Sequence, residues 1–259
     1  MTEAALVDLD GTVYRGDRLL PGADDGIARL RTAGIDPVFL SNNATRRPAD
    51  YRAKLAGFGI EAPADRVVNS AGITAEFLAA EHPGVRVYVA GEAPLVAELE
   101  AAGVPVTAAP ERTDAVLLSL YRSFDYATLE DVLAADRANE PPVFATNPDR
   151  TCPVDGGEIP DCGALVGAVE GLLDRPIDRV LGKPSRVTVD VALARAGAAP
   201  EDCLMIGDRL ETDIRMGAEA GMETVLVTTG VTDRADVAGA AVTPDHVIDS
   251  LADVGTVIE

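Results

Sequence analysis

The sequence has no tryptophan, only two histidines and three cysteines, and no long apolar run. Cys152, Cys162 and Cys203 form no Cys-x-x-Cys pair, so no zinc site is predicted, and their odd number favours reduced thiols. His82 and His246 lie away from the polar clusters described below, which argues against a histidine-based catalytic site. No stretch approaches eighteen apolar residues, so the sequence predicts no transmembrane helix.

Basic residues are also scarce, and nearly all of them are arginine. The 259 residues include 43 acidic and 22 basic side chains, which gives a net charge of −21 at pH 7. Such a charge repels nucleic acid and anionic membranes, so neither is expected as a partner. Lys54 and Lys183 are the only lysines. A lysine kept where arginine usually serves favours a role for its compact ammonium group.

The acidic excess and the scarcity of lysine together resemble the composition of cytosolic proteins from extreme halophiles. A GC-rich genome would also favour arginine over lysine. Stability that does not change between low and multimolar potassium chloride would contradict the halophile hypothesis. The first residues lack the basic and apolar segments of a signal peptide, so we expect a cytoplasmic protein.

Short apolar segments alternate with helix-length segments along the chain, which predicts βαβ units and a parallel sheet. Strands are expected at 4–7, 37–40, 66–70, 85–90, 115–121, 143–146, 203–206, 224–228 and 247–248, and a loop or hairpin at 154–160. Helices are expected at 23–33, 47–58, 92–102, 126–139, 163–173, 183–196 and 211–220. The fold class is therefore α/β, with a doubly wound core of residues 1–77 and 182–259 and an inserted α/β domain at 78–181.

Polar residues follow three of the predicted strands, and a lysine opens one of the predicted helices. In a parallel sheet the carboxyl ends of the strands share one edge, so these residues are expected to converge. Each cluster alone has an alternative interpretation as a capped turn or a solvated surface charge. The residues are Asp8, Asp10, Ser41, Asn42, Asn43, Asp208 and Lys183.

Phosphoryl transfer through an aspartyl-phosphate is the chemistry that fits these residue types. Phosphate and carboxylate repel one another, so Mg²⁺ is expected between them, held by Asp8, Asp208 and the carbonyl oxygen of Asp10. The Asp10 side chain is then available as a general acid and base. Lys183 would place a positive charge where negative charge develops. Asp213 could support Lys183 or a metal-bound water, or could simply be an acid at a helix start.

These residues resemble the motifs of the haloacid-dehalogenase-like (HAD) hydrolase superfamily. Asp8-Leu9-Asp10-Gly11-Thr12 resembles its first motif, Ser41 its second, Lys183 its third, and Gly207-Asp208 with Asp213 its fourth. Leu40-Ser41-Asn42-Asn43 and Ala145-Thr146-Asn147-Pro148-Asp149 are similar to the NagD-like, p-nitrophenyl phosphatase branch (class IIA), which carries an inserted α/β cap.

The resemblance implies a role for each matching residue. Asp8 would be the nucleophile and Asp10 the acid and base, with Mg²⁺ bound by Asp8, Asp10 and Asp208. Phosphate or substrate would be bound by Ser41, Asn42, Asn43, Lys183 and Asn147.

The expected function is a magnesium-dependent phosphomonoesterase acting on a small phosphorylated metabolite, with homodimerisation through the cap as a further possibility. The alternatives are a phosphotransferase or mutase on the same fold and a non-catalytic module that binds a phosphate ligand.

Overall fold

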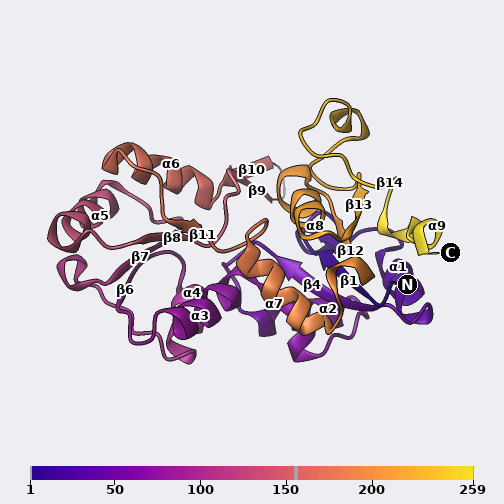
Figure 1. Cartoon of the computed structure of the whole chain (residues 1–259), viewed down its shortest axis with the longest axis horizontal. Coiled ribbons are helices and arrows are strands. Elements are labelled where there is room, and N and C mark those ends of the chain that lie inside the picture. Colours follow the sequence, from indigo (N-terminus) through magenta and orange to yellow (C-terminus); the bar gives the residue numbers. More distant parts are fainter. Residues whose placement is uncertain (1, 155–156, 259) are drawn as a thin grey trace. The chain divides into compact units, whose positions relative to one another are not determined.

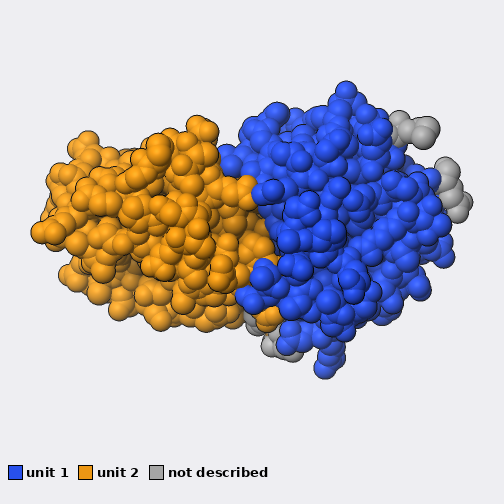
Figure 2. Space-filling model, turned by 90° about the horizontal axis from the view of Figure 1, so that it is seen from below, with its two compact units in different colours: residues 1–41, 49–68, 183–259 blue, residues 42–48, 69–182 orange. Residues whose placement is uncertain are grey.

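Internal contacts divide the chain into two compact units, coloured separately in Figure 2. The structure is a computed structural model that describes residues 2–154 and 157–258. The first unit comprises Met1–Ser41, Ala49–Val68 and Lys183–Glu259, and the second comprises Asn42–Pro48 and Asn69–Gly182. The second unit begins before the inserted domain predicted at 78–181, because helix α3 (Ser70–Glu81) packs against α4 (Ala93–Ala101).

The first unit contains a six-stranded sheet with the strand order β14-β13-β12-β1-β4-β5. β1 pairs in parallel with β4 on one side and with β12 on the other, and the order of the strands reverses at this point. The predicted α/β class with a parallel, doubly wound sheet is confirmed. The strands are β1 (Ala4–Asp8), β4 (Asp36–Ser41), β5 (Val67–Asn69), β12 (Cys203–Gly207), β13 (Glu223–Val227) and β14 (His246–Ile248).

All five residues of β1 are buried, because helices cover both faces of the sheet. Ala5 and Val7 point to the face where α1 (Ala23–Thr32) packs and contributes Ile27 and Leu30. On the opposite face α7 (Arg186–Ala196) contacts β1 and β4, and α8 (Arg215–Ala220) lies against β12. Figure 1 labels these elements. Helices α2 (Pro48–Gly57) and α9 (Gly255–Ile258) complete this unit.

The second unit has a parallel sheet of its own, with the strand order β11-β8-β7-β6. An antiparallel hairpin precedes α6, where a loop or hairpin was predicted at 154–160, and Asp155 and Gly156 of that segment lie outside the described residues. The strands are β6 (Val87–Ala90), β7 (Ala115–Leu118), β8 (Val143–Ala145), β9 (Thr151–Val154), β10 (Gly157–Pro160) and β11 (Arg179–Val180), and the further helices are α5 (Tyr126–Asn139) and α6 (Cys162–Leu173).

Several elements differ from the sequence expectations. Helix α3 was not predicted, and its signal is the N-cap Asn69, whose side chain accepts a hydrogen bond from the backbone N–H of Gly72. The helix expected to start at Lys183 begins at Arg186 instead, because Ser185 caps it.

The helix expected at 211–220 is a π-helical turn, Leu210–Ile214, followed by α8. The small hairpin of β2 (Tyr14–Arg15) and β3 (Arg18–Leu19) was also missed. No helix in the described part of the chain is both long and apolar enough to cross a membrane.

Candidate active site

Three of the predicted site residues lie at the carboxyl edge of the first unit's sheet. Asp8 is the last residue of β1, Ser41 is the last residue of β4, and Asp208 directly follows β12. Because β1 lies between β4 and β12, the parallel pairing brings the three strand ends together. β1 ends at Asp8, so Asp10 is placed by the turn in which Gly11 N–H donates to the Tyr14 carbonyl oxygen.

Lys183 lies between two carboxylates in the interior of the first unit. Its Nζ is 2.5 Å from Oδ1 of Asp8 and 2.6 Å from Oδ1 of Asp213, and only 3% of its side chain is exposed. Burial alone would lower the pKa of Lys183, but the charges of Asp213 and Asp8 outweigh it and raise that pKa above its ordinary value. The ammonium group therefore stays charged at neutral pH.

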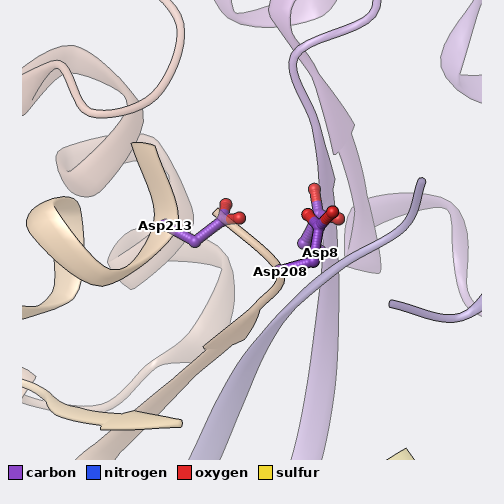
Figure 3. A group of neighbouring side chains, drawn as sticks. All are labelled: Asp8, Asp208 and Asp213. Atoms are coloured by element: carbon purple, nitrogen blue, oxygen red, sulfur yellow. The ribbon is translucent and has the colours of Figure 1, made fainter. Parts of the chain in front are cut away.

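Asp8, Asp208 and Asp213 each offer a carboxylate oxygen, and these oxygens lie within 4.8 Å of one another. Figure 3 shows Asp213 directed toward Asp8 and Asp208. Burial, with the neighbouring carboxylates, raises the pKa of Asp8 well above its usual range despite Lys183, and raises the pKa of Asp208 to about 7. Fully ionised, the cluster would place three carboxylates beside one ammonium group, so it favours either a bound proton or a further cation.

Glycine, which has no side chain, leaves the space in which these carboxylates pack close together. A Cβ atom on Gly207 would lie 2.3 Å from Cγ of Asp213, and one on Gly11 would lie 2.4 Å from Oδ2 of Asp208. Gly11 also has a φ of 99°, which side-chain-bearing residues rarely adopt. The glycines of the first and fourth motifs are therefore required by the packing of the acidic cluster.

Asp10 has a separate set of partners. Its Oδ2 accepts hydrogen bonds from the Tyr14 hydroxyl at 3.2 Å and from the Ser41 hydroxyl at 3.4 Å. Burial raises the pKa of Asp10. The Lys54 ammonium lies 3.6 Å from the centroid of the Tyr14 ring. Both lysines of the chain therefore serve this site, one beside Asp8 and the other behind the tyrosine that holds Asp10.

Thr12, Tyr14 and Lys54 also contribute to the site, although none of them was predicted as a site residue. The Thr12 hydroxyl donates to Oδ2 of Asp8 at 3.2 Å, and the Lys183 ammonium donates to Oδ1 of the same carboxylate. Lys54 is one of only two lysines in the sequence, and this scarcity could have indicated that it has a role in the site. Tyr14 gave no comparable signal, because a buried tyrosine is common in any core.

The predicted residues Asn42, Asn43 and Asn147 belong to the second unit. Asn147 Nδ2 donates to the Asn42 carbonyl oxygen at 2.9 Å, and Asn42 Nδ2 donates to Oδ2 of Asp149 at 3.0 Å. The Asn43 side chain accepts hydrogen bonds from the backbone and hydroxyl of Thr45. Asn42 and Asn147 are thus brought together, whereas Asn43 holds its own loop, and phosphate binding by the three remains a prediction.

The acidic cluster has the composition of a site for a hard divalent cation. Carboxylate oxygens are the ligands that Mg²⁺ and Ca²⁺ favour, and the excess negative charge supplies the attraction. Asp213 contributes less to such a site than Asp8 and Asp208, since Lys183 occupies its Oδ1 and the Arg209 backbone N–H donates to its Oδ2. The residues present therefore fit a divalent cation beside Asp8 and Asp208.

Family models and relatives agree on where this chain belongs. A model described as haloacid dehalogenase-like hydrolase matches residues 5–105, and a HAD-hydrolase-like model matches residues 180–254. Sugar-phosphatase AraL of Bacillus subtilis is 38% identical over 254 residues, which is 98% of this chain and 92% of that protein. The chain belongs to the haloacid-dehalogenase-like hydrolases.

Solved structures match the whole fold. The p-nitrophenyl phosphatase from Archaeoglobus fulgidus superposes with a TM-score of 0.92 at 31% identity and covers 99% of both chains. NagD from Escherichia coli K-12 gives a TM-score of 0.86 at 30% identity over 98% of both chains. Glycerol phosphate phosphatase from Mycobacterium tuberculosis, solved in complex with calcium, gives 0.86 at 32% identity over 97% of this chain and 74% of that one.

These comparisons confirm the predicted NagD-like, p-nitrophenyl phosphatase branch. They also confirm the prediction of an enzyme, a phosphatase of the HAD type, because the matches include proteins named as sugar, glycerol-3-phosphate and p-nitrophenyl phosphatases.

Proposed function

We propose that this HAD-type phosphatase hydrolyses a small phosphorylated sugar or polyol through an aspartyl-phosphate and requires Mg²⁺. The observation that carries the proposal is the buried Asp8 carboxylate, which has Lys183 at 2.5 Å and Asp208 close by at the same sheet edge. A carboxylate enclosed in this way, with one ammonium group and an excess of negative charge, is suited to covalent catalysis that needs a cation.

In the first step a carboxylate oxygen of Asp8 attacks phosphorus, and the bond from phosphorus to the leaving oxygen breaks. Asp10 gives its proton to that leaving oxygen, so the alcohol departs neutral. In the second step water attacks the same phosphorus, Asp10 takes up the water's proton, and the bond to Asp8 breaks to release inorganic phosphate. The Asp10 carboxyl group is positioned for both transfers by Tyr14 and Ser41.

The other residues bind and orient. Lys183 neutralises charge on Asp8 and on the transferring phosphoryl group, and Asp213 fixes the direction of its ammonium group. The Ser41 hydroxyl donates to Asp10 over 3.4 Å, and rotation about its C–O bond would let it donate to a phosphate oxygen instead. Asp8 and Asp208 would hold Mg²⁺ with the Asp10 carbonyl oxygen, and the ion would reduce repulsion between phosphate and carboxylate.

The substrate class is drawn from the relatives. AraL is named a sugar phosphatase, and relatives from Gallus gallus and Corynebacterium glutamicum are named for glycerol-3-phosphate and dihydroxyacetone phosphatase activities. Small sugar and triose or glycerol phosphates are therefore the first substrates to test.

The test is phosphate release from a panel of sugar phosphates, glycerol phosphate, dihydroxyacetone phosphate and p-nitrophenyl phosphate, with Mg²⁺ or with EDTA. We expect release that depends on Mg²⁺ and stops with EDTA. Brief acid quenching with ³²P-labelled substrate should trap one labelled phosphate per chain on Asp8, and Asp8→Asn should abolish the label. Metal-independent release, or turnover without a labelled aspartate, would contradict the proposal.

A panel run with added glycerol separates hydrolysis from transfer. Hydrolysis predicts that free phosphate and released alcohol stay equal in amount at every glycerol concentration. A fall in free phosphate below the released alcohol, with glycerol phosphate formed instead, would favour a phosphotransferase.

A further inference from the structure

The loop that follows β13 lies directly against the Asp208 carboxylate. Val231 N–H donates to Oδ2 of Asp208 at 2.7 Å, and Thr232 N–H donates to the Asp208 carbonyl oxygen at 3.2 Å. A Cβ atom on Gly230 would lie only 1.8 Å from Oδ2 of Asp208. The φ of Gly230 is not in the left-handed region, so the requirement for glycine here comes from space and not from backbone conformation. Residues 229–232, the Asp208 loop, thus fix where this carboxylate lies.

Arg15 holds the Asp208 loop. Its Nη2 donates to the carbonyl oxygens of Thr229 at 2.8 Å and of Gly230 at 3.0 Å. The Thr229 hydroxyl in turn donates to the Gly11 carbonyl oxygen at 2.6 Å. Arg15 and Gly11 both belong to the segment that follows β1 and carries the first motif. The chain that supplies Asp8 and Asp10 therefore also holds the loop that seats Asp208.

We propose that Arg15 is a positioning residue for the divalent-cation site, acting through the Asp208 loop. The inference rests on the proposed function, because it assigns Asp208 as a ligand of Mg²⁺. Mg²⁺ demands near-octahedral geometry with short, nearly fixed distances to its oxygens. A carboxylate that shifts when its supporting loop loosens therefore binds the ion less tightly. Loss of such outer partners at metal sites typically costs about 10- to 100-fold in affinity.

The contacts of Arg15 fit the role of a positioning residue better than the role of a solvated surface charge. Its contacts are carbonyl oxygens 214 and 215 residues away in the sequence, so one guanidinium nitrogen joins the two ends of the catalytic unit. Hydrogen bonds from a charged donor are about twice as strong as neutral ones. Within the part of the chain that the structure describes, the Arg18 side chain makes no hydrogen bond or ion pair, although its backbone is paired with Arg15 in the β2–β3 hairpin.

Arg18 therefore provides a matched control. Arg15→Ala and Arg18→Ala remove the same side chain, with the same charge, from adjacent exposed positions of one hairpin. Long-range electrostatics toward Mg²⁺ change nearly equally in the two variants, whereas only Arg15→Ala releases the loop. Loss of a cation near a cation site would by itself strengthen metal binding, so a weakening in Arg15→Ala opposes the electrostatic trend.

The experiment measures the dissociation constant for Mg²⁺ by titration calorimetry, without substrate, for the wild type and each variant. We expect Arg15→Ala to raise the constant about tenfold, Arg15→Lys to raise it less, and Arg18→Ala to leave it within about twofold of the wild type. Melting temperatures without Mg²⁺ should be similar for Arg15→Ala and Arg18→Ala. An unchanged dissociation constant in Arg15→Ala would overturn the inference, whereas no Mg²⁺ binding by the wild type would overturn the proposed function.

Two further variants keep the test decisive if Arg15→Ala also lowers the melting temperature. Thr229→Val removes the hydroxyl that anchors the loop to Gly11 and should weaken Mg²⁺ binding about three- to tenfold. Gly230→Ala places a methyl group against the Asp208 carboxylate and should weaken binding about 100-fold. Wild-type affinity in Thr229→Val or in Gly230→Ala would mean that the loop does not seat Asp208, and the inference would fail.

Discussion

The two units are built on parallel sheets of the same kind, yet their carboxyl edges carry opposite chemistry. In the first unit, β1 and β12 lead into the charged residues Asp8 and Asp208. In the second unit, β7 and β8 are followed by the neutral residues Ser119 and Thr146, whose hydroxyls hydrogen-bond to each other at 2.9 Å. Both units offer the carboxyl edge of a parallel sheet, and the residue types at that edge determine whether it forms an acidic site.

Buried carboxylates differ between the units in the same way. Asp161 in the second unit is buried, but it is the N-cap of α6 and accepts a hydrogen bond from Cys162 N–H at 2.6 Å. Asp8 and Asp213 in the first unit share the ammonium group of Lys183. Neutral donors, the Cys162 N–H and the Asn147 side-chain amide, contact the first carboxylate, whereas the second group retains a charge imbalance that a ligand can relieve. Burial of charge thus indicates function only where the partners leave it unbalanced.

Asp8→Asn should have the largest effect of any single change. It removes the nucleophile while keeping the size of the side chain, so we expect the rate of phosphate release to fall by about 10⁴-fold or more. Because the change also removes one of three clustered buried carboxylates, the melting temperature without Mg²⁺ should not fall. Asp161→Asn in the second unit is the matched control and should retain activity. Substantial turnover by Asp8→Asn would exclude a covalent aspartate.

Lys183→Met should lower both activity and stability. The substitution leaves Asp8 and Asp213 buried without their cation, which typically costs about 3–5 kcal/mol. We expect urea unfolding without Mg²⁺ to show a loss in this range and phosphate release to fall by at least about 100-fold. Added Mg²⁺ should recover part of the lost stability. A variant as stable as the wild type without Mg²⁺ would mean that the pair with Asp8 and Asp213 contributes little.

The α/β class and most elements could be predicted, because apolar runs of four or five residues between helix-length segments specify buried parallel strands. Asp8, Ser41 and Asp208 could be predicted to converge for the same reason, since each lies at a strand end. Lys183 stood out by the scarcity of lysine and by its place at the start of a predicted helix. The site residues could thus be predicted where they lie at the end of a strand or at the start of a helix.

The supporting residues could not be predicted, because their partners are remote in the sequence. Arg15 contacts carbonyl oxygens more than two hundred residues away. Every residue has a backbone carbonyl, so the residue types at those positions do not reveal the contact. Tyr14 lies in a short hairpin whose two-residue strands are below the length at which alternation is detectable. Helix α3 escaped because its apolar residues do not form a single stripe, so its periodicity is weak.

Mg²⁺ should stabilise the first unit and leave the second nearly unchanged. Binding at about 100 times the dissociation constant adds about 2.7 kcal/mol to the stability of the state that binds. Hydrogen exchange with and without Mg²⁺ should therefore slow at backbone amides of the Asp208 loop, such as Val231, and not at β7 or β8. Equal slowing in both units would mean that the ion acts on the whole molecule, and slowing at β7 and β8 alone would place its site in the second unit.

Asp161→Ala should lower the stability less than Lys183→Met does, because the buried Asp161 carboxylate serves only as a helix N-cap. Loss of an N-cap costs about 1 kcal/mol, which urea unfolding can measure. The gain in stability on adding Mg²⁺ should equal that of the wild type, because this carboxylate has no part in the acidic cluster. A changed response to Mg²⁺ would contradict the division of roles between the two buried carboxylates.

The smallest effect is expected at the opposite edge of the second unit's sheet, where charge is exposed. Arg86 precedes β6 and donates two side-chain hydrogen bonds to Asp114, which precedes β7. These bonds and the Arg86 backbone N–H lower the pKa of Asp114 from 3.8 to about 2. Because the folded pKa is the lower one, the pair stabilises the protein above about pH 4, and this stabilisation is lost as the pH falls toward 2.

Asp114→Asn and Arg86→Gln should therefore each be slightly less stable than the wild type at pH 7, by a difference that shrinks between pH 4 and pH 2. Urea unfolding across this range measures it. Water screens this pair, so the difference should stay well below that of Lys183→Met, where two carboxylates and an ammonium group are buried together. A stability loss as large as that of Lys183→Met would mean that the exposed pair of Arg86 and Asp114 contributes as much as the buried charges of the site.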